Sequence, residues 1–285
     1  MPIVPFKEIL KDAFDKRYGV AAFNIVNDLT LDAVLSAAED AHSPVIIQTS
    51  VKTVKMIGVD VLYAMWKAMA SKAKVPTCIH LDHCPDRAMI SACLAEGWDS
   101  VLFDASSMPL EENRRQTVEV VAEAQRYGAG VEGEIEGIRG VEDGVGSDAE
   151  SDRKTLEASL DFVRVTGVDC FAPAIGNAHG VYLKTPTLDV QRVSDITNTI
   201  PIPIALHGGT GLTKEQFQDL IARGCAKVNI STALKITYMQ SNLAYLREAE
   251  TKNKWDPLSQ FTFVRKAVKE MVSEYLTTFG SVGRA

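Results

Sequence analysis

Cys78-Ile79-His80-Leu81-Asp82-His83-Cys84 is the stretch of this 285-residue chain on which the prediction of its fold depends. An apolar run of strand character ends there in an acid followed by an imidazole. Successive strand side chains point to opposite faces, so Asp82 and His83 diverge unless the strand is ending. At the C-terminal mouth of a parallel strand both reach one pocket, where a metal-binding His beside a proton-transferring Asp suits making or breaking a C–C bond next to a carbonyl. A structural His–Asp hydrogen bond is the alternative.

Apolar, β-rich runs recur along the chain with helical patterns between them. Strands are expected at Val20–Ile25, Val45–Thr49, Thr77–Leu81, Ser100–Asp104, Gly130–Ile135, Cys170–Ile175, Ile202–Leu206 and Lys227–Ile230. Between them, Asp28 or Thr30 can cap a helix over 31–39, residues 110–127 have helical spacing, and 213–216 carry the capping-box pattern. Eight such β-then-α units in about 230 residues are typical of a (β/α)8 TIM barrel, an α/β fold.

A doubly wound sheet is the competing fold. That fold would normally offer a Gly-rich loop after the first strand, and Phe23-Asn24-Ile25-Val26 is not one. No break in composition and no Ser- or Pro-rich linker divides the chain, so we expect one barrel domain over 1–285. The last segment, about 255–285, is predicted to be a C-terminal helical appendage that packs on the barrel or on a partner subunit.

Composition narrows the class of partner and compartment. The net charge of −7 and the lack of a basic stripe argue against nucleic acid, although not against a small anionic substrate. Neither a long apolar span nor a signal peptide is found, so we expect a cytoplasmic protein with no membrane partner. The cysteines are odd in number, lack a C-x-x-C pair and indicate reduced thiols. Cys84 could be mistaken for a metal ligand, but packing is its ordinary role.

Polar residues follow the predicted strands, at the rim where barrel enzymes place their sites. They are Asn24, Ser50, Asp82, His83, Asp104, Glu134, His179, His207, Asn229, Ser231 and Thr232. His83, His179 and His207 follow the third, sixth and seventh strands, and three neutral imidazoles with an open position make a catalytic zinc site. His80 is expected to face the barrel wall, and His42 the surface.

Two Gly-rich turns accompany these histidines, at 176–180 and 207–211. The loops after strands seven and eight are the usual phosphate site of this barrel. Glycines let backbone N–H groups approach an anion closely, and Thr210, Ser231 and Thr232 can donate hydroxyls. The alternative is that the glycines merely permit tight turns.

Several short motifs run collinearly through the chain. They are Ala22-Phe23-Asn24, Pro44-Val45-Ile46-Ile47, His80-Leu81-Asp82-His83, Asp104-Ala105-Ser106, Val131-Glu132-Gly133-Glu134, Glu142-Asp143-Gly144, Ala178-His179-Gly180-Val181-Tyr182, Leu206-His207-Gly208-Gly209-Thr210-Gly211 and Lys227-Val228-Asn229-Ile230, with the tail 280–285. With these motifs the chain resembles the class II, zinc-dependent ketose-bisphosphate aldolases, and among them the tagatose-bisphosphate aldolases most closely.

The resemblance implies that His83, His179 and His207 hold zinc, which polarises the ketone of dihydroxyacetone phosphate as a Lewis acid. It also implies that Asp82 exchanges the proton of the substrate's C4 hydroxyl. Glu142 matches the acid of a mobile loop after the fifth strand, which protonates or deprotonates the substrate carbon.

The remaining implied roles concern secondary metal positions and the substrate. Asp104 and Glu134 match acids at an alternative or second metal position, and hydrogen bonding to the histidines is their other role. The phosphate and hydroxyketone ligands would be Gly180, Gly208, Gly209, Thr210, Asn229, Ser231 and Thr232, with Asn24 and Ser50 also expected to contact substrate. A monovalent cation, often Na+, near the phosphate and a homodimer or homotetramer are implied as well.

Two departures from the family concern the substrate's distal end. Residues 229–233, Asn-Ile-Ser-Thr-Ala, lack the second acid that the family carries there. Arg139 stands in the mobile loop where the family usually has Gly, either as a solvated group or as a ligand for an anionic substituent far from zinc. We therefore hypothesise a sulfonate, as in 6-deoxy-6-sulfofructose 1-phosphate, or a carboxylate, as in 6-phospho-5-dehydro-2-deoxygluconate, as alternatives to the bisphosphates.

Reversible aldol cleavage of a phosphorylated ketose of the tagatose or fructose 1,6-bisphosphate type, giving dihydroxyacetone phosphate and an aldehyde, is the leading hypothesis. A zinc barrel hydrolase or deaminase would need a water-activating acid and often a His-x-His pair on the first strand, and 23–25 offers neither. A non-catalytic partner subunit is a third hypothesis, against which the retention of Asp82 and all three histidines argues. Tagatose and fructose differ by one hydroxyl orientation, and the sequence leaves that choice open.

Overall fold

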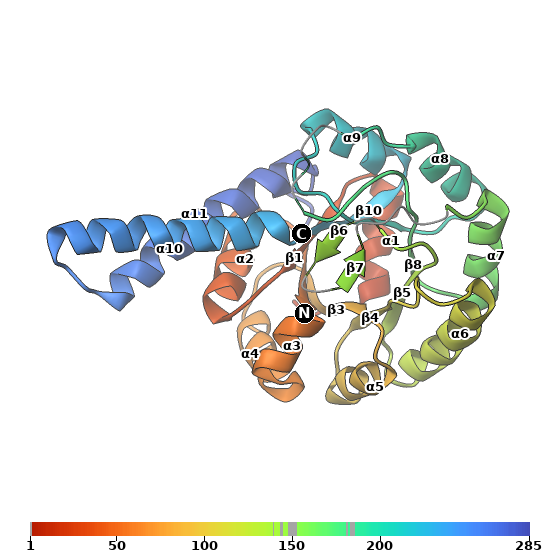
Figure 1. The fold of residues 1–285 in the computed structure, drawn as a ribbon, viewed down its shortest axis with the longest axis horizontal. Coiled ribbons are helices and arrows are strands. Elements are labelled where there is room, and N and C mark those ends of the chain that lie inside the picture. The colour runs from red at the N-terminus through yellow and green to blue at the C-terminus, as the bar shows by residue number, and fades with distance from the viewer. Residues whose placement is uncertain (1, 139, 143–144, 148–152, 181, 183–185) are drawn as a thin grey trace.

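The computed structural model describes the chain except residues 1, 139, 143–144, 148–152, 181 and 183–185 (Figure 1). Parallel strands close a barrel in the order β1-β10-β9-β8-β5-β4-β3-β2. Their bounds are β1 Val20–Asn24, β2 Val45–Ser50, β3 Thr77–Cys84, β4 Ser100–Phe103, β5 Gly130–Glu134, β8 Cys170–Ala172, β9 Ile204–Leu206 and β10 Cys225–Ile230. Each coincides with an expected strand, which confirms the (β/α)8 barrel.

Helices surround this barrel and bury their apolar faces against it (Figure 1). They are α2 Asp28–Asp40, α3 Val51–Ile57, α4 Val59–Ala70, α5 Arg87–Glu96, α6 Leu110–Arg126, α7 Leu156–Thr166, α8 Val190–Thr199 and α9 Lys214–Arg223. The capping box of α9 is confirmed, with Thr213 as N-cap and Gln216 as its partner. At α2 the expectation was wrong, because Asn27 is the N-cap and Thr30 is its third-position partner.

Helix α1 (Phe6–Lys16), which the sequence analysis did not predict, closes the N-terminal end of the barrel. Its Phe6 and Leu10 are buried in one cluster with the small interior side chains Ala22 and Ala172. Above this apolar floor the buried strand residues are polar: Asn24, Gln48, His80, Asp82, Glu132, Glu134, Lys227 and Asn229. The polar layer therefore lies toward the C-terminal ends of the strands, as the barrel topology requires of a site.

Between β5 and α7 the chain forms a small antiparallel hairpin that the sequence analysis also missed. Its strands are β6 (Gly140–Glu142) and β7 (Val145–Ser147). They lie over the barrel in Figure 1, on the segment for which a mobile loop was expected.

The C-terminal region consists of two long helices, α10 (Thr232–Lys252) and α11 (Pro257–Thr278), and a short tail. Figure 1 shows that the pair projects well beyond the barrel before α11 returns beside α2. In α11 the buried side chains recur every fourth residue: Val264, Val268, Val272 and Leu276. Packing on the barrel, one of the two expected placements, is thus found for α11, and no described helix is long and apolar enough to cross a membrane.

Asp99, at the start of β4, provides a test of the fold's pH dependence. Its carboxylate accepts the backbone N–H of Ile79 at 2.8 Å, and burial raises its pKa to about 7. The pKa of Asp99 is higher in the folded protein than in the unfolded chain. Its contribution to folding stability is therefore fully present below the pKa of the unfolded chain and is lost as pH rises through about 7. Asp99→Asn keeps an acceptor and does not ionise, so we expect its stability relative to wild type to rise by on the order of 4 kcal/mol from pH 4 to pH 8. Urea unfolding at both pH values measures this, and a gain of equal size at both would contradict it.

Candidate metal centre and active site

His83, His179 and His207 meet at the C-terminal mouth of the barrel, although they lie far apart in the sequence. One ring nitrogen from each lies within 4.8 Å of the others. The ring centroids of His83 are 4.9 Å from those of His179 and 4.6 Å from those of His207. The three predicted metal ligands are therefore brought together by the fold.

The backbone at His83 explains how it shares a pocket with Asp82. Strand β3 does not end before these residues but continues to Cys84. Its register to β4 shifts between Leu81 and Cys84, and His83 has a left-handed φ of 46°. This irregularity breaks the alternation of sides, and a left-handed φ is uncommon for a non-glycine residue.

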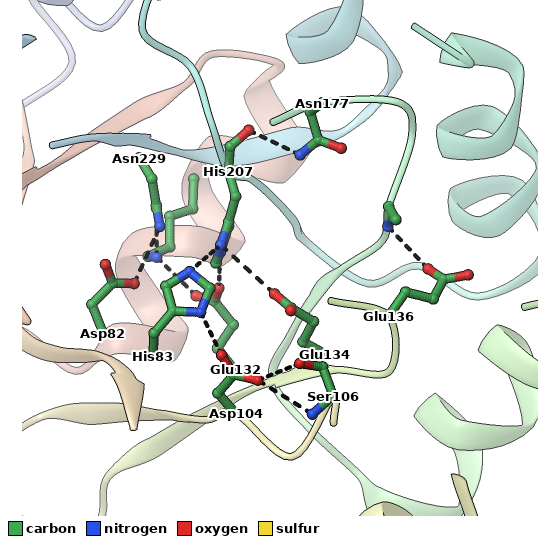
Figure 2. Close-up of polar contacts among 12 residues, drawn as sticks. Asp82, His83, Asp104, Ser106, Glu132, Glu134, Glu136, Asn177, His207 and Asn229 are labelled. Carbon is green, nitrogen blue, oxygen red and sulfur yellow. Dashed lines mark hydrogen bonds and ion pairs between the residues drawn. The ribbon is translucent and has the colours of Figure 1, made fainter. Parts of the chain in front are cut away.

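The imidazoles of His83 and His207 are hydrogen-bonded to carboxylates. Nδ1 of His83 is hydrogen-bonded to Asp104 Oδ2 at 2.8 Å, and Nε2 of His207 to Glu132 Oε1 at 2.6 Å. The other nitrogens, Nε2 of His83 and Nδ1 of His207, face each other at 2.8 Å (Figure 2). Carboxylate-oriented imidazoles with converging nitrogens fit a divalent metal such as zinc. Glu132 was not among the predicted site residues, although it lies two residues before Glu134 and so on the same face of β5.

Asp104 and Glu134 lie with His83 in a second cluster whose ligand atoms are within 4.8 Å of one another. Burial raises the pKa of Glu134 well above its usual range, and the charge of Asp104 adds to this. Burial opposes ionisation of Asp104 too, but the hydrogen bond from His83 holds its pKa well below the usual range. The pKa values of the two acids are therefore shifted in opposite directions.

Asp82 is held by amides and not by its neighbour. Its Oδ2 accepts from Asn24 Nδ2 at 2.9 Å and its Oδ1 from Asn229 Nδ2 at 3.3 Å, whereas His83 bonds Asp104. The structural Asp82–His83 pair that was the alternative is thus replaced by a different set of contacts. Burial raises the pKa of Asp82, but the nearby positive charges of His83 and Lys227 outweigh it and lower that pKa to about 2. The carboxylate is therefore ionised.

Each of these amides is backed by a donor that the sequence analysis did not assign. Gln48 Nε2 donates to Asn24 Oδ1, and Lys227 Nζ donates to Asn229 Oδ1 at 2.7 Å. Because an ammonium is only a donor, the Asn229 oxygen must face it and the Asn229 NH2 must face Asp82. Lys227 Nζ also forms an ion pair with Glu132 Oε2 at 2.9 Å, so one chain of hydrogen bonds and an ion pair runs from Asp82 to His207.

The two Gly-rich turns pack closely beside the histidines. Gly208 has a φ of 64°, and a Cβ there would lie 2.1 Å from the carbonyl oxygen of Ala178. Asn177 Nδ2 donates to the His207 carbonyl at 2.9 Å and Tyr182 OH to the Gly208 carbonyl at 2.9 Å. Close backbone packing and two side-chain hydrogen bonds therefore hold the two turns together. Glycines that merely permit tight turns would not give these contacts.

Ser231 and Thr232 lie where β10 passes into α10. The hydroxyl of Ser231 is buried and has no hydrogen-bond partner among the described residues. A helix N-terminus with a free hydroxyl is suited to an anion such as phosphate. Thr210 lies near, because its Oγ1 accepts the backbone N–H of Ala233 at 3.2 Å.

The structure places the other predicted residues as follows. Ser50 ends β2 in register with Asp82 and caps α3, and His80 is buried inside the barrel, stacked on Phe6. His42 is exposed and Cys84 is buried, as expected. Glu142 ends β6, but its side chain lies outside the described part of the chain. Arg139 also lies outside the described residues.

Comparison with known proteins decides the family. The profile described as "Fructose-bisphosphate aldolase class-II" matches residues 4–284. This chain belongs to that family. The aldolase is 32% identical to a sulfofructosephosphate aldolase of Alkalicoccus urumqiensis over 286 residues, covering 100% of this chain and 99% of the relative.

Solved structures agree. The YdjI aldolase of Escherichia coli K12 has 33% identity and a TM-score of 0.86, covering 99% of both chains. The fructose-bisphosphate aldolase of Campylobacter jejuni shares the fold at 19% identity and a TM-score of 0.84, covering 99% of this chain and 97% of that one. The expectation of a class II aldolase, a carbon–carbon lyase, is confirmed, and the particular likeness to tagatose-bisphosphate aldolases stays a prediction.

Proposed function

We propose that this aldolase reversibly cleaves a phosphorylated ketose to dihydroxyacetone phosphate and an aldehyde, with zinc bound by His83, His179 and His207. The observation that carries the proposal is the convergence of three imidazole nitrogens beside an ionised Asp82. Family membership makes a hydrolase or a non-catalytic subunit a poorer account of the same residues.

The donor set fits zinc because it consists of three imidazoles, of which those of His83 and His207 are oriented by carboxylates. Bound zinc would supply Lewis acidity toward the ketone and hydroxyl oxygens of the substrate. Asp104 and Glu134 would serve an alternative metal position or orient the histidines. A monovalent cation such as Na+ near the phosphate belongs to the same proposal and rests on family resemblance.

In cleavage, a carboxylate oxygen of Asp82 takes the proton of the C4 hydroxyl. The O–H electron pair forms the aldehyde C=O, and the C3–C4 bond pair passes to the dihydroxyacetone phosphate half, whose carbon is then protonated. We assign that last proton to Glu142. The hydrogen bonds from Asn24 and Asn229 fix the orientation of the Asp82 carboxylate and favour its ionised form. A general base must be ionised before it can take the proton.

The phosphate would lie over the turns after β8, β9 and β10. Backbone N–H groups there and the buried Ser231 hydroxyl are the donors on which this placement rests. The proposed ligands are Gly180, Gly208, Gly209, Thr210, Asn229, Ser231 and Thr232, with Asn24 and Ser50 nearer the reacting carbons.

Two substrates are proposed for the distal end. The first is a tagatose or fructose 1,6-bisphosphate. The second, favoured by the 32% identity to a sulfofructosephosphate aldolase over the whole chain, is 6-deoxy-6-sulfofructose 1-phosphate. Both share the dihydroxyacetone phosphate half, and Arg139 is the proposed ligand of the distal anion.

A second copy of the chain is the proposed partner of the projecting helices. On α10 the exposed side chains Ile236, Met239, Leu243 and Leu246 recur at helical spacing, and such an apolar stripe marks an interaction surface. The five cysteines are buried and unbridged, which suits the proposed cytoplasmic location.

The oligomer is tested by sedimentation equilibrium. We expect the wild type to sediment as a dimer or tetramer of the 31.0 kDa chain. Leu243→Glu should shift the equilibrium toward the monomer, because it places a charge in the apolar stripe. Met56→Glu, at a residue 80% exposed on α3, is the control. A monomeric wild type would refute the proposal.

The reaction is tested by release of dihydroxyacetone phosphate from fructose and tagatose bisphosphates, their 6-sulfonate analogue and the keto-acid analogue. We expect cleavage of at least one, loss with EDTA and recovery with zinc. Asp82→Asn should lower kcat by about 10²- to 10⁴-fold while zinc stays bound, because the base is lost and the ligands are not. Asp60→Asn, at an exposed residue of α4, is the control. A zinc-loaded wild type that cleaves none of the four would contradict the proposal.

A further inference from the structure

The loops that leave β5 and β8, neighbouring strands of the barrel, meet above the metal centre. The β8 loop carries His179, and the β5 loop carries the β6–β7 hairpin. Gly140, the first residue of β6, has a φ of 102°, and a Cβ there would lie 2.6 Å from the backbone oxygen and 3.0 Å from the backbone nitrogen of His179. The hairpin therefore rests directly on the backbone of a predicted metal ligand.

Glu136, just beyond β5, joins three separate stretches of these loops with one buried carboxylate. It is 1% exposed. Its Oε1 accepts the backbone N–H of Lys154 at 2.7 Å, where the chain returns from the hairpin to α7. Its Oε2 accepts the backbone N–H of Ala174 at 3.0 Å, on the way from β8 to His179 (Figure 2).

Arg192 of α8 completes the arrangement. Its Nη2 donates to Glu136 Oε1 at 2.6 Å and to Ser159 Oγ at 3.0 Å, and its Nη1 donates to the Lys154 carbonyl at 2.7 Å. Both backbone groups of Lys154 are thus bound. We call Glu136, Arg192 and the Lys154 backbone the exit clamp.

The exit clamp consists of charge-assisted hydrogen bonds in a buried place, where they are strong. A buried ion pair also carries a desolvation penalty, so on average it adds little to stability compared with an apolar packing. The contribution of this pair is to fix the positions of the loops. It fixes both ends of the hairpin-bearing loop, which restricts the conformations of the loop, and it ties that loop to the one that carries His179.

We propose that Glu136 and Arg192 are positioning residues of the aldolase, which hold the β6–β7 hairpin against the backbone of His179. The inference rests on the proposed function, because the hairpin bears Glu142, to which the protonation of the substrate carbon is assigned. The clamp acts through the hairpin and the β8 loop and touches neither metal nor substrate.

Glu136→Gln tests the clamp with little change of shape. Its NH2 group cannot accept a hydrogen bond, so one of the two backbone N–H groups loses its partner. We expect about tenfold lower kcat per bound zinc, with KM changed by less than about threefold, since displacement of a positioned group costs chiefly the chemical step. Hydrogen exchange should quicken over β6, β7 and residues 175–180. Arg192→Lys, which keeps the charge but not the forked contacts, should change both readouts in the same direction and less.

Arg114→Gln is the matched control, because Arg114 bonds Asp161 at 2.5 Å between α6 and α7 in the same sector of the barrel. It should leave kcat and the exchange of the hairpin unchanged. Wild-type exchange in Glu136→Gln would overturn the clamp, and so would quickened exchange with an unchanged kcat, which is the behaviour of a purely stabilising pair. Exchange needs no substrate, so a wild type without aldolase activity would refute the proposed function and leave the clamp to be decided by exchange.

Discussion

Two carboxylate–imidazole hydrogen bonds determine the geometry of the site. Asp104 is hydrogen-bonded to Nδ1 of His83, and Glu132 to Nε2 of His207. The remaining nitrogens, Nε2 of His83 and Nδ1 of His207, face each other at 2.8 Å. A free imidazole can rotate about its side-chain bonds, and a ring with one nitrogen fixed to a carboxylate has a set direction. The geometry of the candidate metal site is therefore set by hydrogen bonds within the barrel.

The charges behind this centre are tolerated because each one has a partner. Lys227 neutralises Glu132 at 2.9 Å and also donates to Asn229. Without that ammonium, Glu132 would be a buried anion beside the imidazoles of His207 and His80 alone among the described residues, which is costly. The apolar cluster that α1 forms closes the N-terminal end of the barrel beneath the polar layer.

Much of the fold could be predicted because strands buried on both faces give continuous apolar runs between helical patterns. Helix α1 was missed although Phe6, Ile9, Leu10 and Ala13 have helical spacing. The left-handed backbone of His83 could not be predicted, since no local pattern requires φ near 46° at a histidine. It follows from the register shift between β3 and β4, which is a tertiary feature.

The cluster of three histidines was predictable because histidines are few and three of them follow strands. Glu132, Gln48 and Lys227 each lie two residues before a predicted site residue and so on the same strand face. Their particular partners could not be predicted, because those depend on how the strands pair. The exit clamp joins Glu136 to Arg192, 56 positions apart, and no spacing rule connects such residues.

The zinc K-edge absorption spectrum of the zinc-loaded enzyme tests the central claim most directly. We expect a first shell of nitrogen and oxygen at about 2.0–2.1 Å with scattering from three imidazoles, falling to two in His207→Ala. A sulfur shell at about 2.3 Å, or a spectrum that His207→Ala leaves unchanged, would contradict the assignment of the metal to these three histidines.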